Sequence, residues 1–114
     1  MPTDYQSALQ ELLRQPLPQF ETEITFLGRL RRGYPPVPGQ VTSLLLALKV
    51  LRNNLKSATE LNRELAQALF LVAYDSRNLF ESGRAANIAW PPLLDEDLAR
   101  IAIAAYKILE NSPS

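Results

Sequence analysis

The sequence contains the same junction twice: an aromatic residue, two prolines, and then a stretch with helical periodicity. Tyr34-Pro35-Pro36 precedes the first of these stretches, and Trp90-Pro91-Pro92 precedes the second. Each proline fixes its own φ and disfavours the helical region for the residue before it. The two aromatic–Pro–Pro joints therefore predict a chain divided into rigid helices at defined positions, with a large aromatic side chain at each division.

Between and beyond these joints, apolar residues recur at spacings of three and four, and no segment alternates in the manner of a strand. We expect helices over residues 4–14, 19–32, 39–54, 58–82 and 95–110. Thr3 is the expected cap of the first helix, with Gln6 as its capping-box partner. The predicted fold is all-α, a single-domain bundle over residues 1–114.

The longest of the expected helices, 58–82, is predicted to lie at the centre of the bundle. Ser57 and Glu60 have the spacing of a capping box at its start, and Gly83 is the expected stop. Its middle, around Phe70 and Leu71, is apolar on nearly every side. A helix that is apolar all round is typically buried.

The residue types of common catalytic sites are missing from this chain. It contains no cysteine and no histidine, which excludes thiol chemistry and removes the commonest general base and metal ligand. The three lysines form no recognisable pair with a serine nucleophile. We identify no catalytic residue, no metal or cofactor site and no small-molecule substrate, and we expect a protein that is not an enzyme.

One enzymatic alternative stays open at this stage. Glu60 and Glu64 share a helix face, and Asp95 and Asp97 could supply a second acidic pair for a Mg²⁺-dependent carboxylate enzyme. The competing interpretation is structural, since acids near a helix start are favoured by capping and by the helix dipole.

The formal net charge is zero, but the charges are segregated along the chain. Residues 29–63 carry seven bases and one acid, whereas the segments on either side each have a net charge of −3. The candidate basic patch consists of Arg29, Arg31, Arg32, Lys49, Arg52 and Lys56. A nucleic-acid-binding domain is therefore an alternative function, with Tyr34 as a stacking surface. The zero net charge argues against it, and bases near helix C-termini also suit the dipole.

A cluster late in the longest helix, next to the Trp90 joint, is the candidate partner-binding surface. Aromatic and arginine side chains are the types enriched in interface hot spots. The cluster consists of Tyr74, Arg77, Asn78, Glu81, Arg84 and Trp90. The predicted function is a non-enzymatic interaction or assembly module that docks either to another protein or to a second copy of itself in a homodimer. The competing interpretation is the polar, solvent-facing side of a long helix.

Two segments resemble parts of a known group of proteins. Residues 35–43, Pro-Pro-Val-Pro-Gly-Gln-Val-Thr-Ser, and residues 90–98, Trp-Pro-Pro-Leu-Leu-Asp-Glu-Asp-Leu, are similar to stretches of short cyanobacterial all-helical proteins without a settled function. The resemblance covers about residues 27–110. Some of these proteins carry the label dethiobiotin synthetase, but that chemistry needs a phosphate-binding G-x-x-x-x-G-K-[ST] loop, which this sequence lacks.

The longest uninterrupted apolar run is Ala68–Tyr74, seven residues. A membrane-spanning helix needs about 20 apolar residues. The first residues also lack the basic and apolar blocks of a secretory signal. We therefore expect no membrane span and a cytoplasmic location.

Overall fold

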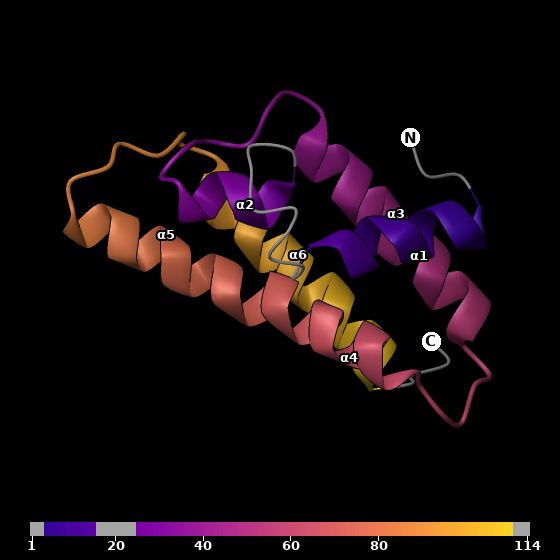
Figure 1. Ribbon diagram of the computed structural model, residues 1–114. Helices are drawn as coiled ribbons and strands as arrows, with labels where there is room; N and C mark the ends of the chain where they lie inside the picture. The colour runs from indigo at the N-terminus through magenta and orange to yellow at the C-terminus, as the bar shows by residue number, and fades with distance from the viewer. Residues whose placement is uncertain (1–3, 16–24, 111–114) are drawn as a thin grey trace.

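The computed structural model describes residues 4–15 and 25–110, and these residues form helices joined by loops (Figure 1). The helices are α1 (Tyr5–Arg14), α2 (Phe26–Arg31), α3 (Gln40–Leu55), α4 (Arg63–Phe70), the π-helical segment η2 (Leu71–Asp75), α5 (Ser76–Ala85) and α6 (Leu94–Leu109). No strand occurs within those two ranges. The all-α prediction is confirmed.

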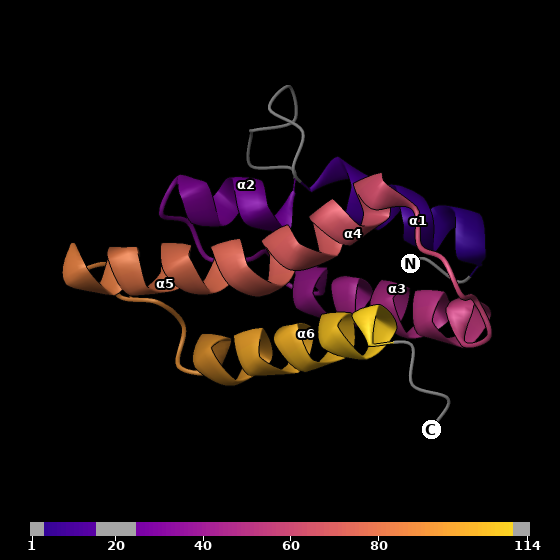
Figure 2. The ribbon, with the colours of Figure 1, turned by 90° about the horizontal axis from the view of Figure 1, so that it is seen from below.

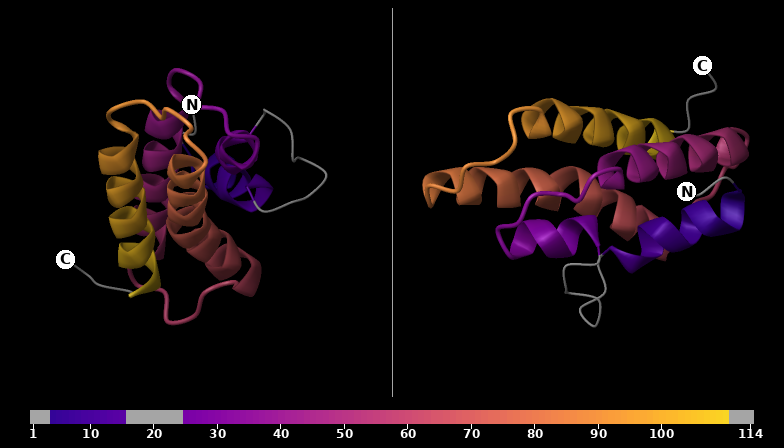
Figure 3. Two further views of the ribbon diagram at one scale, coloured as in Figure 1. Left: turned by 90° about the vertical axis from the view of Figure 1, so that its left-hand side faces the viewer. Right: turned by 90° about the horizontal axis from the view of Figure 1, so that it is seen from above.

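Segments α4, η2 and α5 form one continuous helix, called the long helix below (Figure 1). Helices α3 and α6 pack side by side and run in the same direction, and the long helix runs back against α6 (Figures 2 and 3). Helix α1 packs against α3 and α4, and α2 packs against α5. The long helix is thus covered by α1, α2 and α6.

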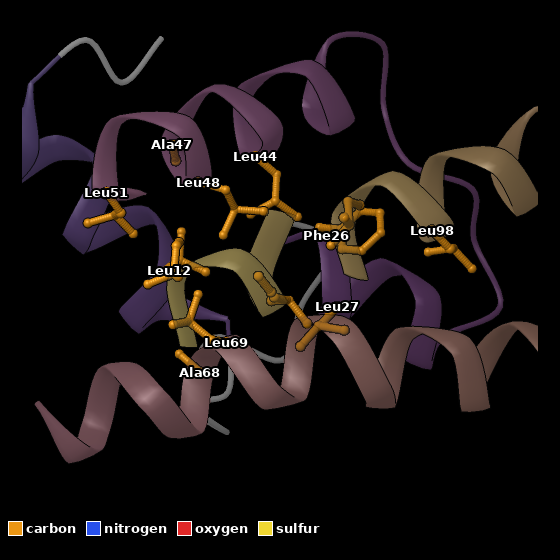
Figure 4. Packing of buried hydrophobic residues seen from close by; sticks show 14 of the residues in the cluster. Leu12, Phe26, Leu27, Leu44, Ala47, Leu48, Leu51, Ala68, Leu69 and Leu98 are labelled. Carbon is orange, nitrogen blue, oxygen red and sulfur yellow. The ribbon is translucent and has the colours of Figure 1, made fainter. Parts of the chain in front are cut away.

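All of the α-helices contribute to one contiguous apolar core (Figure 4). Leu12 of α1, Leu48 of α3 and Leu69 of α4 are each at most 1% exposed. Full burial of one such side chain contributes roughly 1.5–3 kcal/mol. Phe26 and Leu27, at the start of the short helix α2, are both completely buried. The core therefore holds α2 in place although this helix has only six residues.

The start of the first helix differs from the prediction by one residue. Thr3 lies outside the described residues. The N-cap in the structure is Asp4, whose backbone is extended at φ −125° and ψ 170°. The Asp4 Oδ1 atom accepts a 2.8 Å hydrogen bond from the Ser7 amide. This bond to the charged form holds the pKa of the Asp4 carboxyl below its usual value.

Residues 19–24 of the second predicted helix lie outside the described residues. Within the described part, Thr25 is not helical as predicted but is an extended N-cap at φ −94° and ψ 159°. Its hydroxyl accepts a hydrogen bond from the Gly28 amide at 2.9 Å. The buried side chain of Gln15 accepts a second bond, from the Leu27 amide at 3.2 Å. These two bonds satisfy amides that have no partner within the helix and fix its first turn beside the end of α1.

The long helix begins five residues later than predicted. The capping box of Ser57 and Glu60 does not form; instead Asn62 caps the helix, accepting from the Leu65 amide at 3.0 Å. Helix α3 ends at Leu55, and the chain must reverse direction before the long helix can run back along the bundle (Figure 2). Helix α4 then packs against α1 and α6, so residues 56–62 connect α3 to that position instead of forming a tight two-residue turn.

The end of the long helix also lies beyond the predicted stop. The helix continues past Gly83 to Ala85, and Asn87 adopts the left-handed conformation, φ 67°, that follows many helix ends. The Ile88 amide donates to the Gly83 carbonyl at 2.8 Å and completes this cap. Gly83 serves a different purpose, close approach to Trp90.

The prediction that the middle of the long helix is buried all round is wrong on one side. Leu69 and Val72 are fully buried, but Phe70 is 54% exposed and Tyr74 is 55% exposed. Among the described helices, α1, α2 and α6 pack against the long helix, and they leave Phe70 and Tyr74 exposed on its other side. The helix is therefore half-covered rather than central.

The two joints behave as predicted at the level of the backbone. Helices α3 and α6 begin at Gln40 and Leu94, one residue from the predicted starts. The two aromatic residues differ: Trp90 is partly buried against the core, whereas Tyr34 is 41% exposed. None of the helices in the described ranges is long and apolar enough to cross a membrane.

Candidate functional site

Trp90, one of the candidate partner-binding residues, packs against α5 and holds the second proline joint, residues 90–92, in place. Its Nε1 donates to the Phe80 carbonyl at 2.9 Å, and the two rings stack with centroids 6.2 Å apart. The indole also covers Gly83, where a side chain would collide with it. Trp90 is thus engaged within the chain.

The charged members of the candidate cluster form a network around Phe80. Arg77 donates to the Asp95 carboxylate at 2.7 Å and to the Asp95 carbonyl at 3.2 Å, which connects α5 to the start of α6. Glu81 lies between two guanidiniums, 3.6 Å from Arg77 and 3.5 Å from Arg84. Both guanidiniums also lie over the Phe80 ring, 5.2 and 5.5 Å from its centroid. This network stabilises the contact between α5 and α6.

Tyr74 has no such internal role. It stacks on Phe70 with ring centroids 5.1 Å apart and an interplanar angle of 22°. Gln67 and Asn78, about one turn before and after this pair, are also exposed. We call these four residues the aromatic face: Gln67, Phe70, Tyr74 and Asn78.

Sequence reasoning missed Phe70, which it assigned to the core. Its spacing of four from Tyr74 was the available signal, because residues at i and i+4 lie one above the other on a helix. Periodicity cannot, however, distinguish an aromatic residue on the covered side from one on the open side.

A π-helical turn, Leu71–Asp75, lies directly at the aromatic face. Next to it, the buried hydroxyl of Ser76 donates to the Val72 carbonyl at 2.5 Å. A serine hydroxyl that bonds to the carbonyl four residues earlier often accompanies a local bend in a helix. Such π-turns occur frequently at functional sites.

The candidate basic patch does not form one surface, because its two halves lie at separate places in the bundle (Figure 1). Arg29 donates to the Pro35 carbonyl at 2.5 Å and lies over the Tyr34 ring, 5.5 Å from its centroid. Arg31 pairs with Asp75 of the long helix at 3.5 Å. Arg32 is exposed at the end of α2. This half therefore mainly stabilises the first joint and its contact with the long helix.

The other half of the basic patch lies on α3, where Lys49 and Arg52 line a groove of about 290 Å³ between α3 and α6. Arg100 and Lys107 of α6 line the same groove from its other side. Lys56 is exposed further along the chain, outside the groove lining. The fold thus brings together four cations from two segments that are about 50 residues apart in sequence.

The two acidic pairs of the enzymatic alternative are not brought together. Glu60 lies near Ile108 at the C-terminal end of α6, whereas Asp95 and Asp97 lie in its first turn. The intervening helix spans roughly 17–20 Å at 1.5 Å per residue. Within the described ranges, no group of three or more potential metal ligands occurs. These four acids cannot share one cation in this structure.

Comparison with family models, with curated proteins and with solved structures finds no match to this chain. The fold and its surfaces define an all-α bundle with an exposed aromatic face on the long helix and a cationic groove between α3 and α6.

Proposed function

We propose that this chain is a non-enzymatic, cytoplasmic protein–protein interaction module that docks another protein, or a second copy of itself, through the aromatic face of the long helix. The observation that carries the proposal is the stacked, exposed pair of Phe70 and Tyr74. Neither ring attaches one part of the fold to another, as Trp90 attaches the second joint to α5. Tyr74 and Asn78, two of the partner-binding residues predicted from the sequence, belong to this face, and Phe70 joins them.

The pair offers substantial binding energy to a partner. Covering the exposed half of each ring removes roughly 100 Å² of mainly apolar surface from water, about 2.5 kcal/mol per ring at ~25 cal/mol per Å². The two rings are already stacked on each other, so little side-chain freedom remains to be lost on binding. Exposed Gln67 and Asn78 provide a polar edge to the apolar centre, as in many interfaces.

The experiment compares proteins captured from the native lysate by the wild-type chain and by a variant with both Phe70→Ser and Tyr74→Ser. The matched control is Tyr106→Ser, which removes an aromatic side chain that is 60% exposed on α6. Sedimentation velocity over a concentration series tests self-association of all three proteins in parallel. We expect one captured protein, or the dimer, to disappear in the double variant and to persist in the control. Equal behaviour of all three proteins would refute the proposal.

A further inference from the structure

A second surface, the seam between the parallel helices α3 and α6, has a different chemistry from the aromatic face. One part of the seam lies between the two proline joints and has a volume of about 290 Å³. The other part, of similar volume, follows the C-terminal halves of the two helices. Leu45 and Arg100 line both parts, so the seam is one continuous groove that begins beside Pro36 and Pro91.

The groove has an apolar floor between cationic edges. Leu45 and Leu48 of α3 and Ala104 of α6 form the floor, and Ile103 is 57% exposed beside it. The cations at the edges are Lys49 and Arg52 on α3 and Arg100 and Lys107 on α6. None of the described residues that line the C-terminal part of the groove is acidic. At the joint end, Asp97 is the one acid among the described lining residues, and it pairs with Arg100 at 3.2 Å.

We propose that this seam docks an acidic amphipathic helix of a partner protein. An incoming helix of this kind places its apolar stripe on the floor and its carboxylates against the cations on both edges. It therefore matches both the apolar and the cationic surfaces of the groove. From Val41 to Arg52 the groove follows α3 for about 16 Å, the length of about three helical turns. Two parallel helices also present the ridges and grooves into which a third helix packs in a bundle.

The apolar floor distinguishes this ligand from a nucleic acid, since a phosphate backbone offers nothing to Ile103 or Leu48. A second copy of this chain is also a poorer match. Among the described helices, α6 has three acids, but they are confined to its first turn. Of the three acids in the long helix, Asp75 and Glu81 already pair with arginines of the same chain, and Glu64 alone cannot match cations on both edges of the groove. The inference extends the proposed interaction function to a further surface and does not depend on the aromatic face.

The test titrates the full-length ¹⁵N-labelled protein with a synthetic helical peptide of about 14 residues, with leucines on one face and glutamates flanking them. Two matched peptides serve as controls: one with every Glu replaced by Gln, and one with the same composition in an order that destroys the apolar stripe. We expect amide shifts to concentrate in residues 45–52 and 100–107. We also expect each control peptide to bind about tenfold more weakly or worse.

Charge-reversal variants locate the site. Lys49 and Lys107 are exposed, so Lys49→Glu and Lys107→Glu preserve the core, which circular dichroism verifies. Each of these two variants should weaken binding of the acidic peptide about tenfold. The control is Lys56→Glu, at the C-cap of α3 but outside the groove lining, which should change the binding by less than about twofold. The double variant Phe70→Ser and Tyr74→Ser should bind the peptide normally, which separates this inference from the proposed function.

Several results would overturn the inference. These are absence of peptide binding, equal binding of the Gln peptide, shifts centred on residues 67–78, or no effect of the two reversals. Single-stranded RNA and phosphatidylserine vesicles are tested in parallel. If one of them binds more tightly than the peptide and loses binding in the same two variants, that ligand, and not an acidic helix, is the occupant of the groove. Self-association that is lost in the same variants would assign the seam to a second copy.

Discussion

Trp90 lies so close to Gly83 that a β-carbon on residue 83 would be 2.5 Å from the indole Cζ2. The same ring donates through Nε1 to the Phe80 carbonyl one turn earlier. Glycine at position 83 therefore allows the second proline joint to fold down onto α5. That contact sets the point from which α6 begins its return along the long helix (Figure 2).

Gly83→Ala should destabilise the protein by about 1–2 kcal/mol, because the added methyl group overpacks the site and outweighs the gain in helix propensity. Trp90 is the only tryptophan, so its fluorescence reports this site directly. We expect a red-shifted emission and a lower free energy of unfolding in urea. Ser82→Ala, an exposed neighbour on the same helix, is the control and should leave both quantities unchanged. A stable Gly83→Ala variant with unshifted emission would contradict this packing.

The ion pair between Arg77 and Asp95 should show measurable coupling, since it joins two helices by two hydrogen bonds. A double-mutant cycle with Arg77→Met and Asp95→Asn should give about 0.5–1 kcal/mol of coupling energy, because both side chains are partly exposed. The coupling should shrink at 1 M salt. The pair Arg100 and Asp97 lies within one helix and should give only about 0.2–0.5 kcal/mol. Equal coupling in the two cycles would argue against a role for Arg77 in joining the helices.

Asp4 should contribute to acid sensitivity, because its hydrogen bond to the Ser7 amide lowers the pKa of its carboxyl. A carboxyl whose pKa is lowered on folding stabilises the protein above its unfolded pKa of about 3.9 and loses that contribution as pH falls through the folded value. Asp4→Ala should therefore lower the urea midpoint at pH 7 and have less effect at pH 2. Asp4→Asn retains a capping oxygen and should remain closer to wild type at pH 7. A pH-independent effect of Asp4→Ala would contradict the assignment.

Leu69 and Phe70 are adjacent but should respond very differently to truncation. Leu69 is fully buried, so Leu69→Ala should cost about 2–5 kcal/mol of the free energy of unfolding. Phe70 is 54% exposed, and Phe70→Ala should cost less than about 1 kcal/mol, mainly the stacking on Tyr74. A loss of several kcal/mol in Phe70→Ala would mean that the aromatic face is part of the core, as the periodicity alone had suggested.

The backbone plan of this protein follows from local sequence signals. The prolines at 35–36 and 91–92 define the starts of α3 and α6, because their effect on φ is local and strong. Gly33 ends α2 in the left-handed conformation, φ 78°, which glycine adopts readily. At the two joints, where the prolines decide the local geometry, the predicted helix starts were confirmed to within one residue.

Competition between two local signals was harder to resolve. The spacing of Ser57 and Glu60 matches a capping box, but Asn62 is an equally good cap five residues later. The choice depends on where α4 packs, which is against α1 and α6. This placement comes from tertiary packing and is not visible in a window of ten residues.

The candidate surfaces were predictable only in part. Tyr74 and Asn78 were among the selected residues, but the internal roles of Arg77 and Trp90 depend on contacts across the second joint. The cationic groove joins Lys49 to Lys107, residues that come together only because α3 and α6 pack in parallel. Which face of a helix stays uncovered is likewise a property of the whole bundle.

The most direct test of the proposed function is site-specific photocrosslinking in the native cell with benzoylphenylalanine in place of Tyr74. The probe retains an aromatic ring at the exposed position, and the same probe at Ser82, exposed further along the same helix, provides the control. We expect one discrete crosslinked protein, or a crosslinked dimer, from position 74 and none from position 82. No adduct at position 74, or the same set of adducts at both positions, would contradict the claim that the aromatic face is a docking surface.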